Sequence, residues 1–336
     1  MTLIRPPSEV GDASGPARRP AAGRAVAVLV LVALAALIPL LGPAAALRGT
    51  GEAAAPGAGG VALLRTVLFG AVCVGAGELF AAGLARQIPG APPVDPPRSW
   101  TPFAALAGSV AALGLASVVA TGNLVPQHLA DIDVGGLYRT REGALALLEV
   151  NAFVVAGLCA LSRRPARQVW PLAAVVVAEA LRAHPPTEHS PLTGSALTLV
   201  HLVCAAVWAG GLLNVLRLLR AWRTPEAGAA LLGRYARVAA VLLAAITATG
   251  VCSTLRRMPP GTVLDQLTTT AYGRTLLAKV LLVAGVAVLA LCARLRLRRT
   301  ADPLSACSPA RAEVVALGVV VAVSALLTAV PLPIRW

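Results

Sequence analysis

The chain has 336 residues, of which 57% are hydrophobic and only 13% are charged, and it carries a formal net charge of +14. A soluble domain is ordinarily about half apolar and about a quarter charged, so this composition indicates a polytopic membrane protein. The positive charge does not indicate a nucleic-acid partner, because the arginines are clustered beside long apolar runs and only 4% of the residues are aromatic.

Nine apolar segments each come close to the roughly 20 residues that a helix needs to cross a bilayer. In chain order they cover residues 25–47, 61–85, 102–122, 143–161, 168–184, 195–218, 235–255, 273–293 and 312–331. Backbone polar groups must be hydrogen-bonded within lipid, so each segment is predicted to be a helix. We therefore predict an all-α fold, a polytopic transmembrane helix bundle with about nine membrane-spanning helices embedded in the lipid bilayer.

The first segment has two interpretations. Residues 1–23 are rich in Pro and Arg and are predicted to be a disordered cytoplasmic tail. The segment RAVAVLVLVALAALIPLLGPAAAL follows, with a basic flank and a small-residue end that resemble a cleaved signal peptide. Its apolar part is longer than that of a typical signal peptide, so we favour a retained helix. Cleavage would leave eight spans with the same topology.

The distribution of arginine orients the bundle. Arginine clusters follow every second span, around residues 163–167, 217–223 and 294–299, and the intervening loops carry fewer. Short loops rich in positive charge stay in the cytoplasm, so the N-terminus is predicted to be cytoplasmic and the C-terminus extracytoplasmic. The basic excess is almost entirely Arg, with Lys279 as the only lysine, in a chain rich in Ala and Gly. This composition predicts a bacterial plasma (inner) membrane protein.

Three of the four histidines fall in AHPPTEHSPLTGSALTLVH, between the fifth and sixth spans. His184 closes the fifth helix, and two prolines prevent that helix from continuing. Glu188 and His189 follow in an extracytoplasmic loop, where they fit a metal site and a solvated loop equally well. His201 is about six residues into the next helix, or roughly 9 Å at 1.5 Å per residue.

Polar residues of neighbouring spans lie at a similar depth. They are Glu149 and Asn151 in the fourth span, Glu179 in the fifth and Lys279 in the eighth. A charge that faces lipid is costly, so these side chains are expected to point into the bundle and to form a supporting polar layer. The alternative is a buried structural ion pair among the two glutamates and the lysine.

The sixth span places His201, Cys204 and Trp208 on one helix face by their i, i+3, i+7 spacing. Neutral imidazole binds copper, zinc or haem iron, and a thiolate shifts the preference toward Cu(I). We expect His201 to be a metal ligand, and the alternative is a core histidine whose nitrogens are hydrogen-bonded. Packing explains Cys204 more readily than ligation does. Met258 and Glu188 are candidate contacts at the outer mouth.

Three motifs in the second half of the chain resemble a known family. HLVCAAVWAGGLL, at residues 201–213, is similar to the H-x-x-x-A-A-x-W-x-G-G-L helix of the CopD/YcnJ copper-resistance membrane proteins. RYARVAAVLLAAITATGV and LTTTAYGRTLLAKVLL follow in the family's order. The chain departs from the family at Ala183, where glycine is usual, and at Cys292 and Ala293, where Asn-Arg is usual.

The resemblance covers roughly residues 180–299. It implies a CopD-like membrane domain at 162–336, preceded by an N-terminal four-helix membrane region at 24–161 that matches only in hydropathy. The implied function is copper transport or copper homeostasis at the plasma membrane, without enzymatic activity. A separate extracytoplasmic copper carrier of the CopC type is the implied protein partner.

The resemblance also implies roles for the polar residues. The copper ion would meet the outer histidines first and then pass inward, while the polar layer sets local charge and proton balance. The candidate copper ligands are His184, His189, His201 and Cys204.

Two other functions stay open at this point. One is a membrane oxidoreductase or electron carrier that binds haem b through His201 and Lys279. The other is a membrane assembly scaffold without a metal. The direction of transport, the oxidation state of copper, the coupling ion and the oligomeric state are not predicted.

Overall fold

The computed structural model describes residues 19–92, 97–122, 124–126, 128–188, 190–222, 224–299 and 304–332. Most of the predicted N-terminal tail, and His189, therefore lie outside the described residues. The helices are α1 (Arg19–Leu47), α2 (Ala58–Ala85), α3 (Thr101–Ala120), α4 (Val134–Arg139), α5 (Arg141–Leu161), α6 (Val169–Arg182), α7 (Pro191–Trp222), α8 (Pro225–Arg257), α9 (Val263–Thr269), α10 (Ala271–Arg299) and α11 (Leu304–Leu327). The predicted all-α bundle is confirmed, and the described residues contain no strand.

Each predicted span coincides with a helix, but the helices differ in length. Six of those described are long and apolar enough to cross a bilayer, namely α2, α3, α5, α7, α8 and α10. Helix α6 has only 14 residues and ends at Arg182, two residues before the predicted end at His184. At 1.5 Å per residue it is about 21 Å long, too short to cross the hydrocarbon core as a straight helix.

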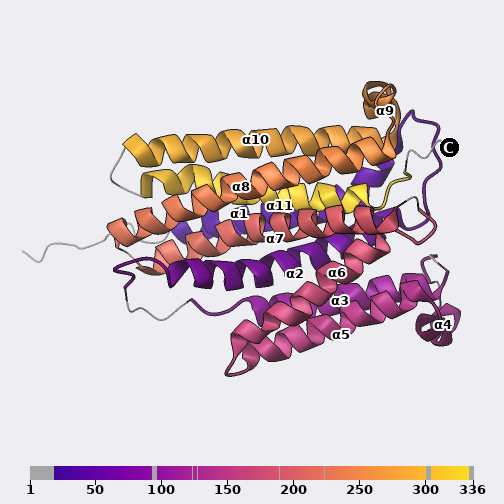
Figure 1. Cartoon of the computed structure of the whole chain (residues 1–336), viewed down its shortest axis with the longest axis horizontal. Helices are drawn as coiled ribbons and strands as arrows, with labels where there is room; N and C mark the ends of the chain where they lie inside the picture. Colours follow the sequence, from indigo (N-terminus) through magenta and orange to yellow (C-terminus); the bar gives the residue numbers. More distant parts are fainter. Residues whose placement is uncertain are drawn as a thin grey trace, which may run out of the picture.

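The long helices run side by side along the longest axis of the molecule (Figure 1). Helices α2 and α7 lie in the middle and pack against each other, α3, α5 and α6 lie along one flank, and α8, α10 and α11 lie along the other. The short helices α4 and α9 and the loop between α6 and α7 are together at one end. We call this the α9 end; the connections from α5 to α6 and from α7 to α8 lie at the opposite end.

Two glycines allow the central helices to approach closely. A Cβ atom added at Gly210 of α7 would lie 1.7 Å from the carbonyl oxygen of Cys73 on α2. A Cβ atom at Gly77 of α2 would lie 2.1 Å from the carbonyl carbon of Gly210. Small residues permit such backbone contact between membrane helices, and this contact fixes the position of α7, which carries His201.

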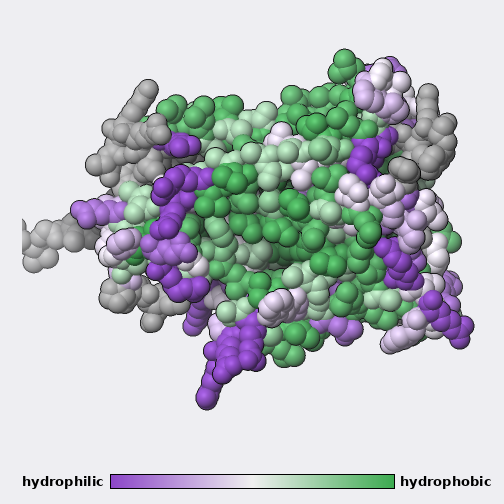
Figure 2. Space-filling view, viewed as in Figure 1, coloured by the Kyte–Doolittle hydropathy of each residue, from purple (hydrophilic) through white to green (hydrophobic). Residues whose placement is uncertain are grey.

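The surface matches a bilayer environment. Figure 2 shows a face that is hydrophobic along its middle and hydrophilic at its two ends. Large apolar side chains point outward on the flank, for example Phe103 (75% exposed) and Leu106 (65% exposed) of α3. Exposed apolar area of this extent is unstable in water but favourable in lipid. The chain is a multi-pass membrane protein.

Candidate functional site

A cavity of about 250 Å³ lies between α2, α6, α7, α8, α10 and α11. Its wall is mostly aliphatic and includes His201 of α7 and Lys279 of α10, two of the predicted site residues. His201 is ten residues after the first residue of α7, so it lies about 15 Å from that end of the helix. The sequence placed it about six residues, or roughly 9 Å, into the helix; the difference arises because α7 begins at Pro191, four residues earlier than predicted.

The His201 ring has one nitrogen engaged and one available. Its Nδ1 is 3.0 Å from the hydroxyl oxygen of Thr249 on α8. The Thr249 hydroxyl is also 2.7 Å from the Ala245 carbonyl, to which it can donate, and this favours the tautomer in which Nδ1–H donates to Thr249. In this tautomer Nε2 is the unprotonated nitrogen, and no hydrogen bond joins Nε2 to another described residue. A neutral imidazole fixed in this tautomer offers its Nε2 lone pair to a metal.

His184 has neither ring nitrogen available. Its Nδ1 is 2.6 Å from Oε2 of Glu188, and its Nε2 is 2.9 Å from Oγ1 of Thr198. The ring is only 4% exposed, and a Cβ atom at Gly194 would lie 2.4 Å from Nδ1. His184 therefore fastens the loop after α6 to the start of α7. Thr198 lines the cavity, whereas His184 lies behind it.

Two carboxylates of the predicted polar layer converge on an arginine that sequence reasoning missed. Arg182 places Nη2 2.8 Å from Oε2 of Glu149 and Nη1 3.4 Å from Oε1 of Glu179. Glu149 is fully buried and Glu179 is 6% exposed. Asn151, in contrast, is exposed, and its amide donates to the Leu147 carbonyl of its own helix. The signal for Arg182 was its position three residues after Glu179, at adjacent positions on one helix face.

The other predicted contacts are not in the cavity wall. Cys204 packs at the edge of an apolar cluster, while Cys73 of α2 lines the cavity. Met258 is fully buried among apolar side chains, so it is not open at the mouth. Glu188 is held by His184 and by Arg256, whose Nη2 lies 3.3 Å from Oε1. Over the described part of the chain, no three His, Cys, Asp or Glu side chains gather closely enough to hold a metal ion.

A second cavity, of about 190 Å³, lies toward the opposite end between α7, α8, α10 and α11. Trp208, which is 3% exposed, lines both cavities. Glu313 and Arg294 also line the second cavity, and the Trp208 side chain is within hydrogen-bonding reach of the Glu313 carboxylate. The Trp208 carbonyl accepts from the Tyr235 hydroxyl at 2.8 Å. Sequence reasoning missed Glu313.

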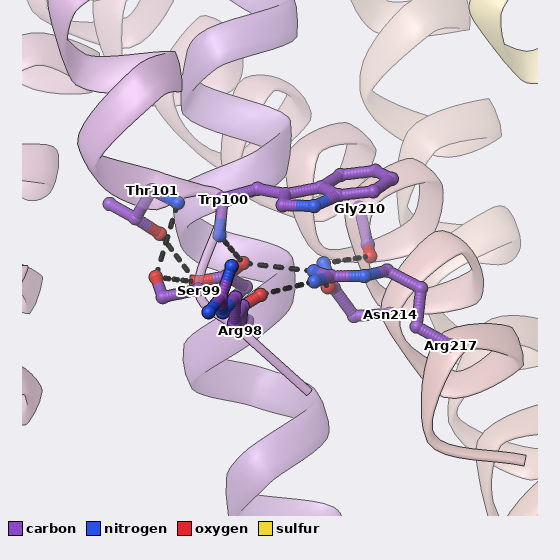
Figure 3. A network of polar contacts seen from close by, with 8 residues as sticks. Arg98, Ser99, Trp100, Thr101, Gly210, Asn214 and Arg217 are labelled. Atoms are coloured by element: carbon purple, nitrogen blue, oxygen red, sulfur yellow. Dashed lines mark hydrogen bonds and ion pairs between the residues drawn. The ribbon is translucent and has the colours of Figure 1, made fainter. Parts of the chain in front are cut away.

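Glu78 of α2 is the centre of a polar network at the end opposite α9. Figure 3 labels its partners Ser99, Trp100, Thr101 and Arg217. The Glu78 carboxylate accepts hydrogen bonds from the Ser99 hydroxyl at 2.5 Å, the Trp100 N–H at 2.6 Å and the Thr101 hydroxyl at 2.7 Å. Arg217 of α7 donates to it at 3.0 Å. Glu78 thus binds the first turn of α3 and ties α2, α3 and α7 together.

Arg217 completes this network. Its guanidinium lies 3.9 Å from the centroid of the Trp100 ring, and it donates to the Asn214 side chain at 2.8 Å and to the Arg98 carbonyl. The four hydrogen-bond donors around Glu78 favour a paired acid.

Part of the chain matches a known protein family. Residues 229–327 match the family model described as Copper resistance protein D. The match spans α8 to α11 with Thr249 and Lys279, and it confirms the resemblance to this family; it begins after the His201 helix of α7. No curated protein and no solved structure matched the chain.

Proposed function

We propose that this membrane protein of the CopD copper-resistance type handles copper at the plasma membrane and binds the ion at His201. The observation that carries the proposal is the pairing of His201 with Thr249. It leaves Nε2 without a hydrogen bond in a cavity wall, which is the state required of an imidazole ligand. Thr249 lies within the family match, so the residue that orients the ring belongs to the copper-related part of the chain.

The remaining ligands in this proposal differ from those predicted by spacing alone. Cys73 lines the same cavity and offers sulfur, the softer donor that suits Cu(I). Glu179 lines it as well, although its carboxylate is shared with Arg182. His184 becomes a ligand only if the loop after α6 releases its bonds to Glu188 and Thr198. We propose that this loop, on the extracytoplasmic side, accepts copper from a separate CopC-like carrier.

A complementation experiment tests the proposal in cells. A strain lacking the gene receives the wild-type chain, His201→Ala, or the control His128→Ala, which changes an exposed histidine away from the cavity. Cell-associated copper and the amount of protein in the membrane are measured after copper exposure. We expect His128→Ala to restore the parental copper level and His201→Ala to resemble the deletion. Less copper in the deletion than in the parent indicates uptake, and more indicates export.

Two results would contradict this function. His201→Ala that restores the parental copper level, at an equal amount of membrane protein, excludes His201 as the copper ligand. A Soret band in the purified wild-type chain that disappears in His201→Ala favours the haem-binding alternative instead.

A further inference from the structure

The cavity beside His201 carries far more positive than negative charge. Four cationic side chains line it, and Glu179 is the only carboxylate among the described lining residues. The cations are Arg65, Arg182, Arg257 and Lys279. Glu149, which pairs with Arg182 outside the lining, brings the number of acidic side chains to two, against four basic ones. Unpaired charge is costly in a membrane interior, so a cavity with this excess favours an anionic ligand.

Three of these cations have no acidic partner in the structure. Across the described residues, no carboxylate lies within ion-pair distance of Arg65, Arg257 or Lys279. Arg65 donates from Nη1 to the Thr328 carbonyl at 3.2 Å, and its buried Nε has no hydrogen-bond partner. Arg257 has only the Tyr272 hydroxyl at 3.2 Å and the ring of the same tyrosine. These donors remain available to a ligand.

The charged and apolar parts of the wall are separated along the bundle. Arg182 and Arg257 are the last residues of α6 and α8, and Arg65 contacts the residue that follows α11, so these three lie toward the α9 end. Toward the middle of the bundle the wall is mostly apolar around His201 and Lys279. It includes Leu68, Val72, Val175, Ala206, Val283 and Leu317. The cavity thus combines a cationic mouth with an apolar interior.

We propose that this cavity binds an anionic amphiphile, a molecule with a phosphate or carboxylate head and an apolar tail. The head would pair with Arg65 and Arg257 at the mouth and with Lys279, which lines the cavity eight residues into α10, and the tail would cover the apolar wall. Charge-assisted hydrogen bonds from arginine to such an oxyanion are the strong ones, and an apolar tail adds area removed from water. The proposal stands independently of copper binding. A bound anion would also offset the positive field that a copper ion meets at His201.

Native mass spectrometry of the full chain tests this proposal. The purified protein, in a neutral detergent, is titrated with phosphatidylglycerol, with phosphatidylcholine and with inorganic phosphate. We expect one phosphatidylglycerol per chain to bind more tightly than phosphatidylcholine. Lys279→Gln and Arg257→Gln should each weaken that binding roughly tenfold, because each removes one hydrogen bond to a charged group. Lys279→Arg keeps the positive charge and should bind phosphatidylglycerol as tightly as the wild type does.

The matched control is Arg237→Gln, which removes one exposed positive charge outside the cavity and should leave the lipid affinity unchanged. Equal affinity for the two lipids would overturn the proposal, as would unchanged affinity in both cavity variants. Inorganic phosphate that binds as tightly as phosphatidylglycerol would also overturn it, because the tail would then contribute nothing.

Discussion

Arg182 forms ion pairs with two buried carboxylates. Its single positive charge is shared by two ion pairs, one with Glu149, which is fully buried, and one with Glu179, which is 6% exposed. Among the described residues neither Glu149 oxygen has a hydrogen-bond partner, and the one cation in ion-pair contact with this carboxylate is Arg182. Removal of one partner from a buried pair is far more costly than removal of both.

We therefore predict that Arg182→Gln destabilises the protein by about 3 kcal/mol or more, since it leaves two buried carboxylates without a cation. Thermal unfolding in detergent, followed by tryptophan fluorescence, measures the effect. The double variant Arg182→Gln with Glu149→Gln should recover part of the lost stability. The single variant Glu149→Gln is measured as well. If the double variant loses as much stability as Arg182→Gln and Glu149→Gln lose together, the two residues are not coupled.

The polar layer illustrates what residue spacing can and cannot predict. The sequence predicted that Glu149 and Glu179 point inward, because a charge facing lipid is costly, and both are buried. It did not predict that Asn151, two residues from Glu149, is exposed. An uncharged amide can donate to its own helix, as Asn151 does to Leu147, so its burial is not required. Depth along a helix follows from counting residues, whereas the direction of a side chain depends on the neighbouring helices.

At the scale of the helices, the Glu78 network holds the start of α3. The Glu78 carboxylate accepts a hydrogen bond from the N–H of Trp100, the N-cap residue of α3. The dipole of a helix favours an anion at this end. Glu78 also pairs with Arg217 of α7. The segment around Arg98 is held through the same arginine, whose guanidinium donates to the Arg98 carbonyl.

Glu78→Gln should release this segment. Hydrogen bonds to charged groups contribute about 1.5–3 kcal/mol, so we expect roughly ten- to a hundredfold more opening around Arg98. The measurement is the rate of tryptic cleavage after Arg98 in the purified protein. The control Glu226→Gln changes an exposed acid at the same end and should cleave at the wild-type rate. A Glu78→Gln protein that resists trypsin as well as the wild type would show that the network does not hold this segment.

Helix ends were predicted less well than helix positions. Hydropathy detects only the apolar part of a helix, whereas α7 extends over 32 residues, from Pro191 to Trp222, beyond the predicted span at both ends. The short helices α4 and α9 lie in segments predicted as outer loops. Helix α5 begins directly after α4 because the Thr140 side chain caps it by accepting from the Gly143 N–H at 3.1 Å.

At the scale of the whole molecule, the sequence predicted the bundle but not its cavity. The cavity wall comes from helices whose residues are up to 263 positions apart, as the contact from Arg65 to Thr328 shows. Spacing within one helix placed His201 and Cys204 on a common face, yet Cys73 of α2 supplies the thiol that reaches the cavity. Contacts between distant segments depend on how the helices pack, which periodicity along a single chain does not specify.

The orientation of the bundle remains a prediction from arginine distribution, and it can be tested directly. In a variant without native cysteines, Leu264→Cys places a thiol on α9, where Leu264 is 82% exposed. Ser162→Cys places one at an exposed position at the opposite end. A membrane-impermeant thiol reagent added to intact cells should label Leu264→Cys only. Labelling of Ser162→Cys alone would reverse the topology and place the cavity mouth in the cytoplasm.

We propose that His201, held by Thr249, binds copper in the cavity. The most direct measurement is the copper affinity of the purified full chain, determined for both oxidation states by competition with a chelator of known affinity. We expect one copper per chain, loss of this binding in His201→Ala, and a ten- to a hundredfold lower affinity in Thr249→Val, because Thr249 orients the ligand. The exposed control His128→Ala should bind as the wild type does. Wild-type copper affinity in His201→Ala would exclude His201 as the copper ligand.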